Sequence, residues 1–240
     1  MGMESVRKVV AGLVLLCALG APFTFIQAEQ PGADPAINQP YRDPDFDTWV
    51  ARFEQPGREV YDLRQEIVAA TGVREGMDVA DIGAGTGLFT LLFARKVGAE
   101  GRVYAVDIAE KFVKNIRRRA QEQGLNNVVG IVNNQADTKL PPQSIDLAFI
   151  CDAYHHFEKP QEMLRSIHQA LRPGGTLVIV DFRRDDGASS SWVKEHVRAG
   201  KETVIREVET AGFELAGDEG FLKRNYFLRF VKRGAATVLQ

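Results

Sequence analysis

Short apolar runs alternate with longer amphipathic stretches through the middle of the chain, from residue 77 to residue 180. The apolar runs predict buried strands over 77–82, 102–106, 128–132, 145–151 and 176–180. The intervening stretches predict helices over 87–97, 109–123 and 161–171, the last ended by Arg172-Pro173-Gly174-Gly175. This alternation is typical of a parallel sheet with helices on both faces. Between 132 and 145 the chain reads mostly as loop, so the third crossover helix is expected to be short or lacking.

The region before this core has a different pattern. Residues 30–44 are rich in Pro, Asp and Asn and lack a periodic apolar face, which predicts an extended linker. Helical spacing follows over 47–53 and 58–70, with a break at Pro56-Gly57.

The end of the chain differs again. A helix is expected over 201–211, and strands are expected over 213–216 and 226–231. No helical pattern separates the two strands. They therefore predict an antiparallel pair added to the edge of the parallel sheet.

The first 28 residues are a separate kind of sequence. Arg7 and Lys8 precede an apolar run that thins out toward Ile26, and Ala28 is a small residue before a plausible cleavage point. This is the pattern of a secretory signal peptide, so we expect export to the periplasm or beyond. The alternative is an uncleaved membrane anchor, because the run approaches the length that crosses a bilayer. Pro22 favours cleavage.

Composition and net charge limit the classes of binding partner that we expect. The chain has 240 residues, enough for one sizeable domain with an extension, and a net charge of −2. That charge gives no reason to expect nucleic acid as a partner, and a membrane is expected only if the leader stays uncleaved. Removal of the leader would take Cys17 with it and leave Cys151 without a disulfide partner. Cys151 lies in an apolar run, which favours a buried small hydrophobe.

The most informative segment runs from Asp81 to Gly87. A buried strand ends in an acidic residue there, and Gly83, Gly85 and Gly87 form a dense turn before a helix opens at Leu88. Glycines allow a tight turn and let a ligand approach the backbone. The spacing differs from the G-x-G-x-x-G of dinucleotide enzymes, because Leu88 stands where the last glycine would be.

A second carboxylate follows at Asp107, where the next strand ends. In doubly wound nucleotide-binding folds, an acidic residue about 20 residues after the glycine turn holds the ribose hydroxyls. A carboxylate can accept hydrogen bonds from two neighbouring hydroxyls. The alternative is that Asp107 only caps the helix that starts at Ala109.

These features resemble the class I S-adenosylmethionine-dependent methyltransferases. Residues 79–87 are similar to the first motif of that family and Asp107 to the acidic residue of the second. Residues 145–156 resemble the strand-four motif, and residues 171–179 resemble the strand-five motif. The resemblance covers most of the chain, from about residue 58 to residue 232.

The resemblance implies a fold and a cofactor. The fold is α/β: a Rossmann-like, doubly wound, mostly parallel seven-stranded sheet with an antiparallel C-terminal strand and helices on both faces. The cofactor is S-adenosyl-L-methionine. We therefore divide the chain into a leader over 1–28, a linker and lid segment over 29–57, and a methyltransferase domain over 58–240.

Positions matched to the family also imply roles for individual residues. Asp81 would orient the methionine ammonium, directly or through water, and Asp107 would bind the ribose hydroxyls. Asp137 would bind the adenine amino group, although the preceding Asn133-Asn134-Gln135 departs from the usual Gly-Asp pattern. Four further cofactor-binding residues are Gly83, Gly85, Gly87 and Asp152.

The acceptor side is expected just past the fourth strand, where His155 and His156 stand together. An imidazole near the methyl group could shape the pocket or take a proton, so these two are the candidate catalytic residues. The alternative is a purely structural role in the cofactor loop. Adjacent side chains usually point in different directions, so we expect no metal.

The end of the fifth strand and the segment after it carry several basic residues. If they meet over the site, they would favour an anionic small-molecule acceptor; the alternative is a solvated basic face. These residues are Arg183, Arg184, His196, Arg198 and Lys201. Trp49, Phe53 and Tyr61 are candidates for a lid on the cofactor, or for core.

Methyl transfer to a small acceptor has two rivals. One is a nicotinamide-dependent oxidoreductase, which the glycine spacing and the C-terminal strand pair disfavour. The other is a non-catalytic module that binds S-adenosylmethionine on the same fold. Export keeps this second rival open, because the cofactor is made in the cytoplasm, whereas the full set of matched positions argues against it.

Overall fold

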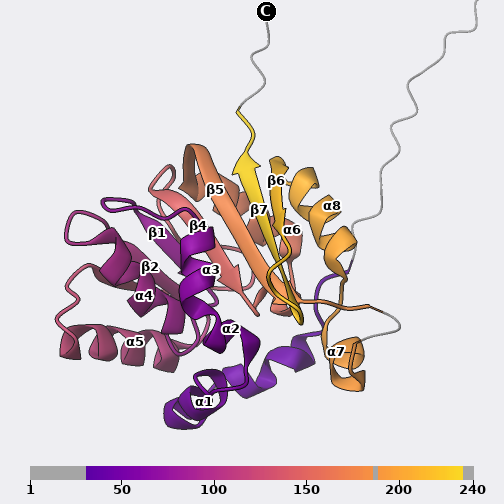
Figure 1. Ribbon diagram of the computed structural model, residues 1–240, viewed down its shortest axis with the longest axis horizontal. Coiled ribbons are helices and arrows are strands. Elements are labelled where there is room, and N and C mark those ends of the chain that lie inside the picture. Colours follow the sequence, from indigo (N-terminus) through magenta and orange to yellow (C-terminus); the bar gives the residue numbers. More distant parts are fainter. Residues whose placement is uncertain (1–30, 186–188, 235–240) are drawn as a thin grey trace, which may run out of the picture.

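A seven-stranded sheet runs through the centre of the molecule, in a computed structural model that describes residues 31–185 and 189–234 (Figure 1). Its strand order is β3-β2-β1-β4-β5-β7-β6. The strands are β1 (Val79–Ile82), β2 (Val103–Asp107), β3 (Val128–Val132), β4 (Ile145–Cys151), β5 (Leu171–Phe182), β6 (Phe213–Glu219) and β7 (Asn225–Lys232). The expected leader over 1–28 lies outside the described residues.

Strand direction confirms the predicted sheet. The neighbouring pairs from β3 to β5 are all parallel, and β7 is antiparallel to both β5 and β6. Residues 133–144, between β3 and β4, contain no helix. Strand β5 begins at Leu171, earlier than expected, so the Arg-Pro-Gly-Gly segment that stops the preceding helix already belongs to the sheet.

Period-two alternation divides the strand side chains between two faces. On one face, Ala80, Ile82 and Ile179 pack against α6 (Pro160–Ala170) and α8 (Lys201–Thr210). On the other face, Val79 and Val178 pack against α3 (Arg64–Ala70) and α4 (Leu88–Val97). Helix α5 (Glu110–Glu122) lies on this second face, where its Ile116 meets Ala105. The sheet is therefore doubly wound, as predicted.

The N-terminal segment corrects one expectation. Residues 30–44 were predicted as an extended linker, but Pro35–Tyr41 form a 3₁₀ helix, η1, capped by Asp34. The helix is docked on the domain, because the buried Asn38 donates to the backbone oxygen of His156 and to Glu158. A segment with the composition of a linker can thus form a helix where a capping side chain and tertiary hydrogen bonds stabilise it.

Three helices gather at the end of the sheet where the parallel strands finish (Figure 1). They are α1 (Phe46–Phe53), α2 (Glu59–Asp62) and α7 (Ser191–His196). Helix α7 was not among the predicted elements. Because parallel strands end at one edge, residues at the ends of several strands line one cavity with residues of α1 and α7.

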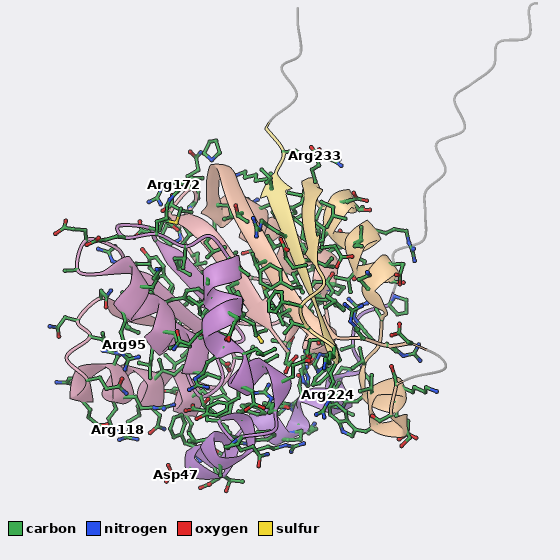
Figure 2. The ribbon with its side chains drawn as sticks, viewed as in Figure 1. Asp47, Arg95, Arg118, Arg172, Arg224 and Arg233 are labelled. Atoms are coloured by element: carbon green, nitrogen blue, oxygen red, sulfur yellow. The ribbon has the colours of Figure 1, made fainter. Side chains whose placement is uncertain are left out.

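The outer surface carries charge of both signs. The side chains labelled in Figure 2, Asp47 and five arginines, lie at separate places around the molecule and form no single basic face. Among the described residues, no helix has the length and apolar character needed to cross a membrane.

Candidate functional site

A cavity of about 320 Å³ opens at the carboxyl edge of the parallel strands. It is lined by residues that follow β1, β2, β3, β4 and β5, together with parts of the N-terminal segment and α7. The strand order reverses between β1 and β4, and ligands of open α/β sheets bind at such a switch point. Seven predicted site residues line the cavity: Asp81, Gly83, Gly85, Asp107, Asp152, His155 and His156. Gly87 and Asp137 do not.

The three glycines of the turn meet different steric requirements. All have positive φ, at 74° for Gly83, 55° for Gly85 and 85° for Gly87. A Cβ on Gly83 would lie 2.5 Å from the Cβ of Ala153, whereas one on Gly87 would lie 2.8 Å from a side-chain carbon of Ile116. Gly87 therefore lets α5 pack against the turn, and it contributes to the cavity only indirectly.

Asp81 lies at the end of β1 with little exposure to solvent. Its Oδ2 accepts a hydrogen bond of 2.6 Å from the Thr90 hydroxyl of α4. Burial raises the pKa of this carboxyl to about 7, and the charge of Asp107 adds to the increase while the Thr90 bond opposes it. A cation placed in the cavity would stabilise the ionised form.

Asp107 serves two backbone groups at once. Its Oδ2 accepts from Gly85 N at 2.8 Å, and its Oδ1 accepts from Ala109 N at 2.9 Å. The second bond closes a turn just before α5, whose N-cap residue is Ala109 and which has no side-chain cap, so the structure does not make Asp107 the cap of that helix. The first bond ties the carboxylate to the glycine turn. Burial raises its pKa to about 6, although these hydrogen bonds lower it in part. Each oxygen keeps acceptor capacity for a ligand.

The segment after β3 does not place Asp137 as the family pattern implies. Its Oδ1 accepts hydrogen bonds from Lys139 N at 2.8 Å and from the Ser166 hydroxyl at 2.9 Å, so it closes a local turn against α6. Asn133, Asn134 and Gln135 line the cavity instead. The departure from the usual Gly-Asp pattern is the sequence signal for this difference.

Asp152 is held by two partners from distant parts of the chain. Arg58 donates to its Oδ2 and Asn225 donates to its Oδ1, both at 2.6 Å. Its φ of +48° is unusual for a non-glycine residue, and such strain persists only where the surroundings enforce it. Burial raises the pKa of Asp152, and the Arg58 charge opposes the increase.

His155 is positioned by the carboxylate of Asp181, which lies near the end of β5. Its Nδ1 lies 2.7 Å from Asp181 Oδ1, and its backbone N–H donates to Oδ2 at 3.0 Å. Both side chains are buried. Burial lowers the pKa of His155, but the charge and hydrogen bond of Asp181, helped by Asp152, raise it by more.

His156 and His196 complete a cluster with His155. The ring centroids of His155 and His156 lie 4.3 Å apart, and each lies 5.3 Å from that of His196 on α7. Burial, together with the other two imidazoles, lowers the pKa of His156 to about 2. Its buried Nδ1 has no hydrogen-bond partner within the described ranges.

Aromatic side chains surround this cluster. Tyr41 of η1 packs edge-on against His156, Phe182 packs edge-on against His155, and Trp192 stacks on His196. All three aromatics line the cavity. Tyr41 and Trp192 were not predicted as site residues, because each belongs to a short element, η1 or α7, that was not predicted.

The N-terminal segment forms a wall of the cavity at Phe53, Arg52 and Arg58. It is fastened by Glu54, which pairs with Arg119 at 2.6 Å, while Arg119 also donates to the backbone oxygen of Thr86 in the glycine turn. Phe53 thus has the position expected of a lid, whereas Trp49 is buried among aromatic neighbours and does not line the cavity.

The basic residues after β5 do not meet over the site. Arg198 pairs with Glu207, Lys201 pairs with Asp218, and Arg183 donates to the backbone of Asn225. Of the five residues in that prediction, only His196 lines the cavity. The guanidiniums that do line it, Arg52 and Arg58, come from the N-terminal segment.

Comparison with known proteins points the same way as the geometry. A family model described as a methyltransferase domain matches residues 74–226. The ubiquinone/menaquinone biosynthesis C-methyltransferase UbiE of Hydrogenovibrio crunogenus is 28% identical over 182 residues, covering 64% of this chain and 72% of that protein. UbiE of Idiomarina loihiensis is 34% identical over 129 residues, covering 52% of this chain and 51% of its own length.

A solved structure supports the fold. The crystal structure of a SAM dependent methyltransferase from Aquifex aeolicus superposes with a TM-score of 0.70 at 23% identity, covering 79% of this chain and 99% of that one. The segment matched by the family model contains the glycine turn, Asp107 and both adjacent histidines. The chain therefore belongs to the class I S-adenosylmethionine-dependent methyltransferases, and its cofactor is S-adenosylmethionine.

Proposed function

We propose that this chain transfers the methyl group of S-adenosylmethionine to a small aromatic acceptor that carries an acidic group. The observation that carries the proposal is the continuity of the cavity. Gly85 and Asp107 line the same cavity as the histidine cluster and its aromatic neighbours, and we call these two parts the first and the second end. A single chamber of this kind can hold the cofactor and an acceptor in contact.

The residues at the first end fit the cofactor. Within the described residues, Thr90 is the only residue that hydrogen-bonds to the Asp81 carboxylate, which keeps acceptor capacity for the methionine ammonium. Asp107 keeps acceptor capacity for the ribose hydroxyls, and Gly85 leaves the space of a side chain beneath Phe53. The amides of Asn133 to Gln135 suit the polar edge of adenine, in place of Asp137.

The cofactor supplies an activated methyl group on a sulfonium, so the protein has to align the acceptor and exclude water. We assign that work to His155 and His156. His155 is the better positioned of the two, because Asp181 fixes its ring. Fastening of the N-terminal wall by Glu54 and Arg119 would keep water out.

The chemical class of the acceptor is inferred from the side chains that line the second end of the cavity. Tyr41, Phe182 and Trp192 offer ring faces and edges to a flat molecule. Arg52 lines the same cavity, stacks over Trp49 and forms no ion pair in the described part of the chain, so it can receive an anion. The UbiE relatives are named for quinone biosynthesis, which agrees with a ring-shaped acceptor.

The test is a screen for turnover. Purified protein is incubated with S-adenosylmethionine and a panel of phenolic and aromatic carboxylate compounds, and S-adenosylhomocysteine is measured. We expect release to depend on one class of acidic aromatic. The contrary outcome is tight cofactor binding without formation of S-adenosylhomocysteine for any acceptor class. If the histidine variants then also bind the cofactor as tightly as the unmodified protein, the result would favour the non-catalytic binding module.

Cofactor affinity is expected to rise with pH between 5 and 7.5. The free protein has Asp107 with a pKa of about 6 and Asp81 with a pKa of about 7, and both must be ionised to receive hydroxyls and an ammonium. Raising the pH removes the bound protons from both groups, so the association constant should increase by roughly a hundredfold or more and then level off. Calorimetry across this range measures it.

The control for this pH dependence is Asp81→Asn, which cannot ionise. It should bind more weakly at pH 7.5 and should lose the part of the increase near pH 7. Affinity that is flat from pH 5 to pH 7.5 in the unmodified protein would show that neither carboxylate meets the cofactor.

We further propose that the chain is exported. The support is the basic start at Arg7 and Lys8, the apolar run after it, and Ala28. Mass spectrometry of protein recovered from the native cell should find a first residue at or near Glu29. Full-length chain in the soluble cytoplasm would contradict export, and recovery only with detergent would favour the uncleaved anchor.

A further inference from the structure

Three of the four histidines in the sequence converge in one place, although only two are neighbours in the chain. His155 and His156 come from η2 (Tyr154–His156), directly after β4, and His196 ends α7. One ring nitrogen from each lies within 4.8 Å of the others. Histidine is the commonest metal ligand among the side chains, so three imidazoles this close together are a candidate metal site.

The cluster has the second-layer contact that metal-binding histidines show. Ligating histidines almost always give their other ring nitrogen to a carboxylate or carbonyl, which fixes the ring. Asp181 holds Nδ1 of His155 at 2.7 Å and leaves its Nε2 available. Trp192 stacks on His196 with ring centroids 4.5 Å apart.

His156 contributes an independent observation. Its Nδ1 is buried and has no hydrogen-bond partner in the part of the chain that the structure describes. A buried nitrogen without a partner costs free energy, and a ligand is one way to satisfy it. Within the described chain, no other unpartnered buried nitrogen belongs to a histidine.

We propose that His155, His156 and His196 bind one divalent transition-metal ion, with zinc as the best match. Imidazole nitrogens suit zinc and its neighbours better than magnesium or calcium, which prefer oxygen ligands. The adjacent pair alone gave no reason to expect a metal. The third ligand from α7 changes that conclusion, because it makes a three-histidine set.

The geometry needs modest closure. Zinc–nitrogen bonds of about 2.0–2.1 Å in a tetrahedron place the nitrogens roughly 3.3 Å apart, so the widest pair must close by roughly 1.5 Å. His196 is partly exposed and belongs to the short helix α7, so its side chain has the most freedom to move. Three protein ligands leave a coordination position for an exogenous ligand.

Charges of both signs lie near the cluster. The carboxylates of Asp181 and Asp152 act on His155, and the guanidinium of Arg52 acts on His196. Arg198 also acts on it, but it is paired with Glu207 at 2.7 Å. A cation bound there would therefore have the Asp181 carboxylate in direct contact with a ligand, and the guanidinium of Arg52, which forms no ion pair within the described residues, in the neighbourhood.

The cluster belongs to the end of the cavity assigned to the acceptor. The consequence for the acceptor rests on the proposed function: the open coordination position would take an oxygen or sulfur anion. Metal binding itself does not rest on it, so the two can fail separately.

The experiment is a zinc titration of the full chain, prepared without an affinity tag of histidines and stripped with a chelator. Calorimetry should show one Zn²⁺ per chain. His196→Ala should weaken the affinity by roughly a hundredfold or more, and Asp181→Asn by about 10–100-fold. Co²⁺ should give the intense visible absorption of a tetrahedral site and should quench tryptophan fluorescence, because Trp192 stacks on a ligand.

His168→Ala is the matched control, because His168 packs against Phe213 away from the cluster and should leave zinc affinity unchanged. S-adenosylmethionine binding is measured on every preparation to show that each variant is folded. Cofactor binding without saturable zinc binding, or equal weakening by His168→Ala and His196→Ala, overturns the metal site alone. Zinc binding without cofactor binding overturns the proposed function and leaves the metal site standing.

Discussion

Gly85→Val is expected to abolish S-adenosylmethionine binding. Gly85 has a φ of +55°, its N–H donates to Asp107, and its missing side chain leaves space beneath Phe53. A Cβ there would already lie 3.6 Å from the Phe53 ring, so the methyl groups of valine would occupy the place of the ligand. The strained backbone would also disturb the hydrogen bond that orients Asp107. Calorimetry with S-adenosylmethionine measures the loss.

Gly174→Val separates loss of ligand space from loss of stability. Gly174 has a similar φ of +72°, but a Cβ there would have no atom within 4 Å and it does not line the cavity. A β-branched residue in the left-handed region costs roughly 1–3 kcal/mol at either position. We expect comparable drops in melting temperature, with cofactor affinity retained in Gly174→Val. Normal binding by Gly85→Val would place the cofactor elsewhere.

His155→Ala is expected to lower turnover by roughly 10²-fold while leaving the cofactor dissociation constant nearly unchanged. The imidazole lines the acceptor end of the cavity and is fixed by Asp181, so its loss leaves the acceptor misaligned. Single-turnover formation of S-adenosylhomocysteine, with the acceptor found by the screen, measures the effect. Equilibrium binding of the cofactor is measured in parallel.

Two further variants make this result specific. Asp181→Asn keeps the shape but removes the charge that orients His155, and it should lower turnover by a smaller factor. His168→Ala changes a histidine outside the cavity and should behave like the unmodified protein. If His155 is only structural, its loss should instead lower the melting temperature or weaken cofactor binding, with turnover reduced only in proportion. That outcome would remove His155 from the catalytic assignment.

Much of the fold could be predicted because its signals are local. The strands β3 and β4 have the predicted bounds, and most other elements differ by only a few residues at their ends. Period-two and helical spacing record which side of an element is buried, and that information lies within about ten residues. The exceptions, η1, η2 and α7, are short. They depend on tertiary contacts, and in η1 and α7 also on a side-chain cap, and neither leaves a periodic pattern in the sequence.

The cofactor end of the site could also be predicted from the sequence, because its signals are local. Asp81, Gly83 and Gly85 are neighbours in the chain, and Asp107 follows at the end of the adjacent strand. Asp137 is the informative departure, because its carboxylate closes a turn with Ser166, which lies 29 residues away. A motif position cannot reveal such a competing partner.

The sequence by itself determined the order of strands and helices, the glycine turn and the two carboxylates at the strand ends, because each depends on neighbours in the chain. Only the tertiary structure decided which side chains meet across it. Asp181 reaches His155 from 26 residues away, Arg58 reaches Asp152 from 94, and His196 joins the histidine pair from another helix. Such contacts follow from the order of strands in the sheet, which brings the ends of β1, β4 and β5 to one edge, and no local pattern encodes that distance.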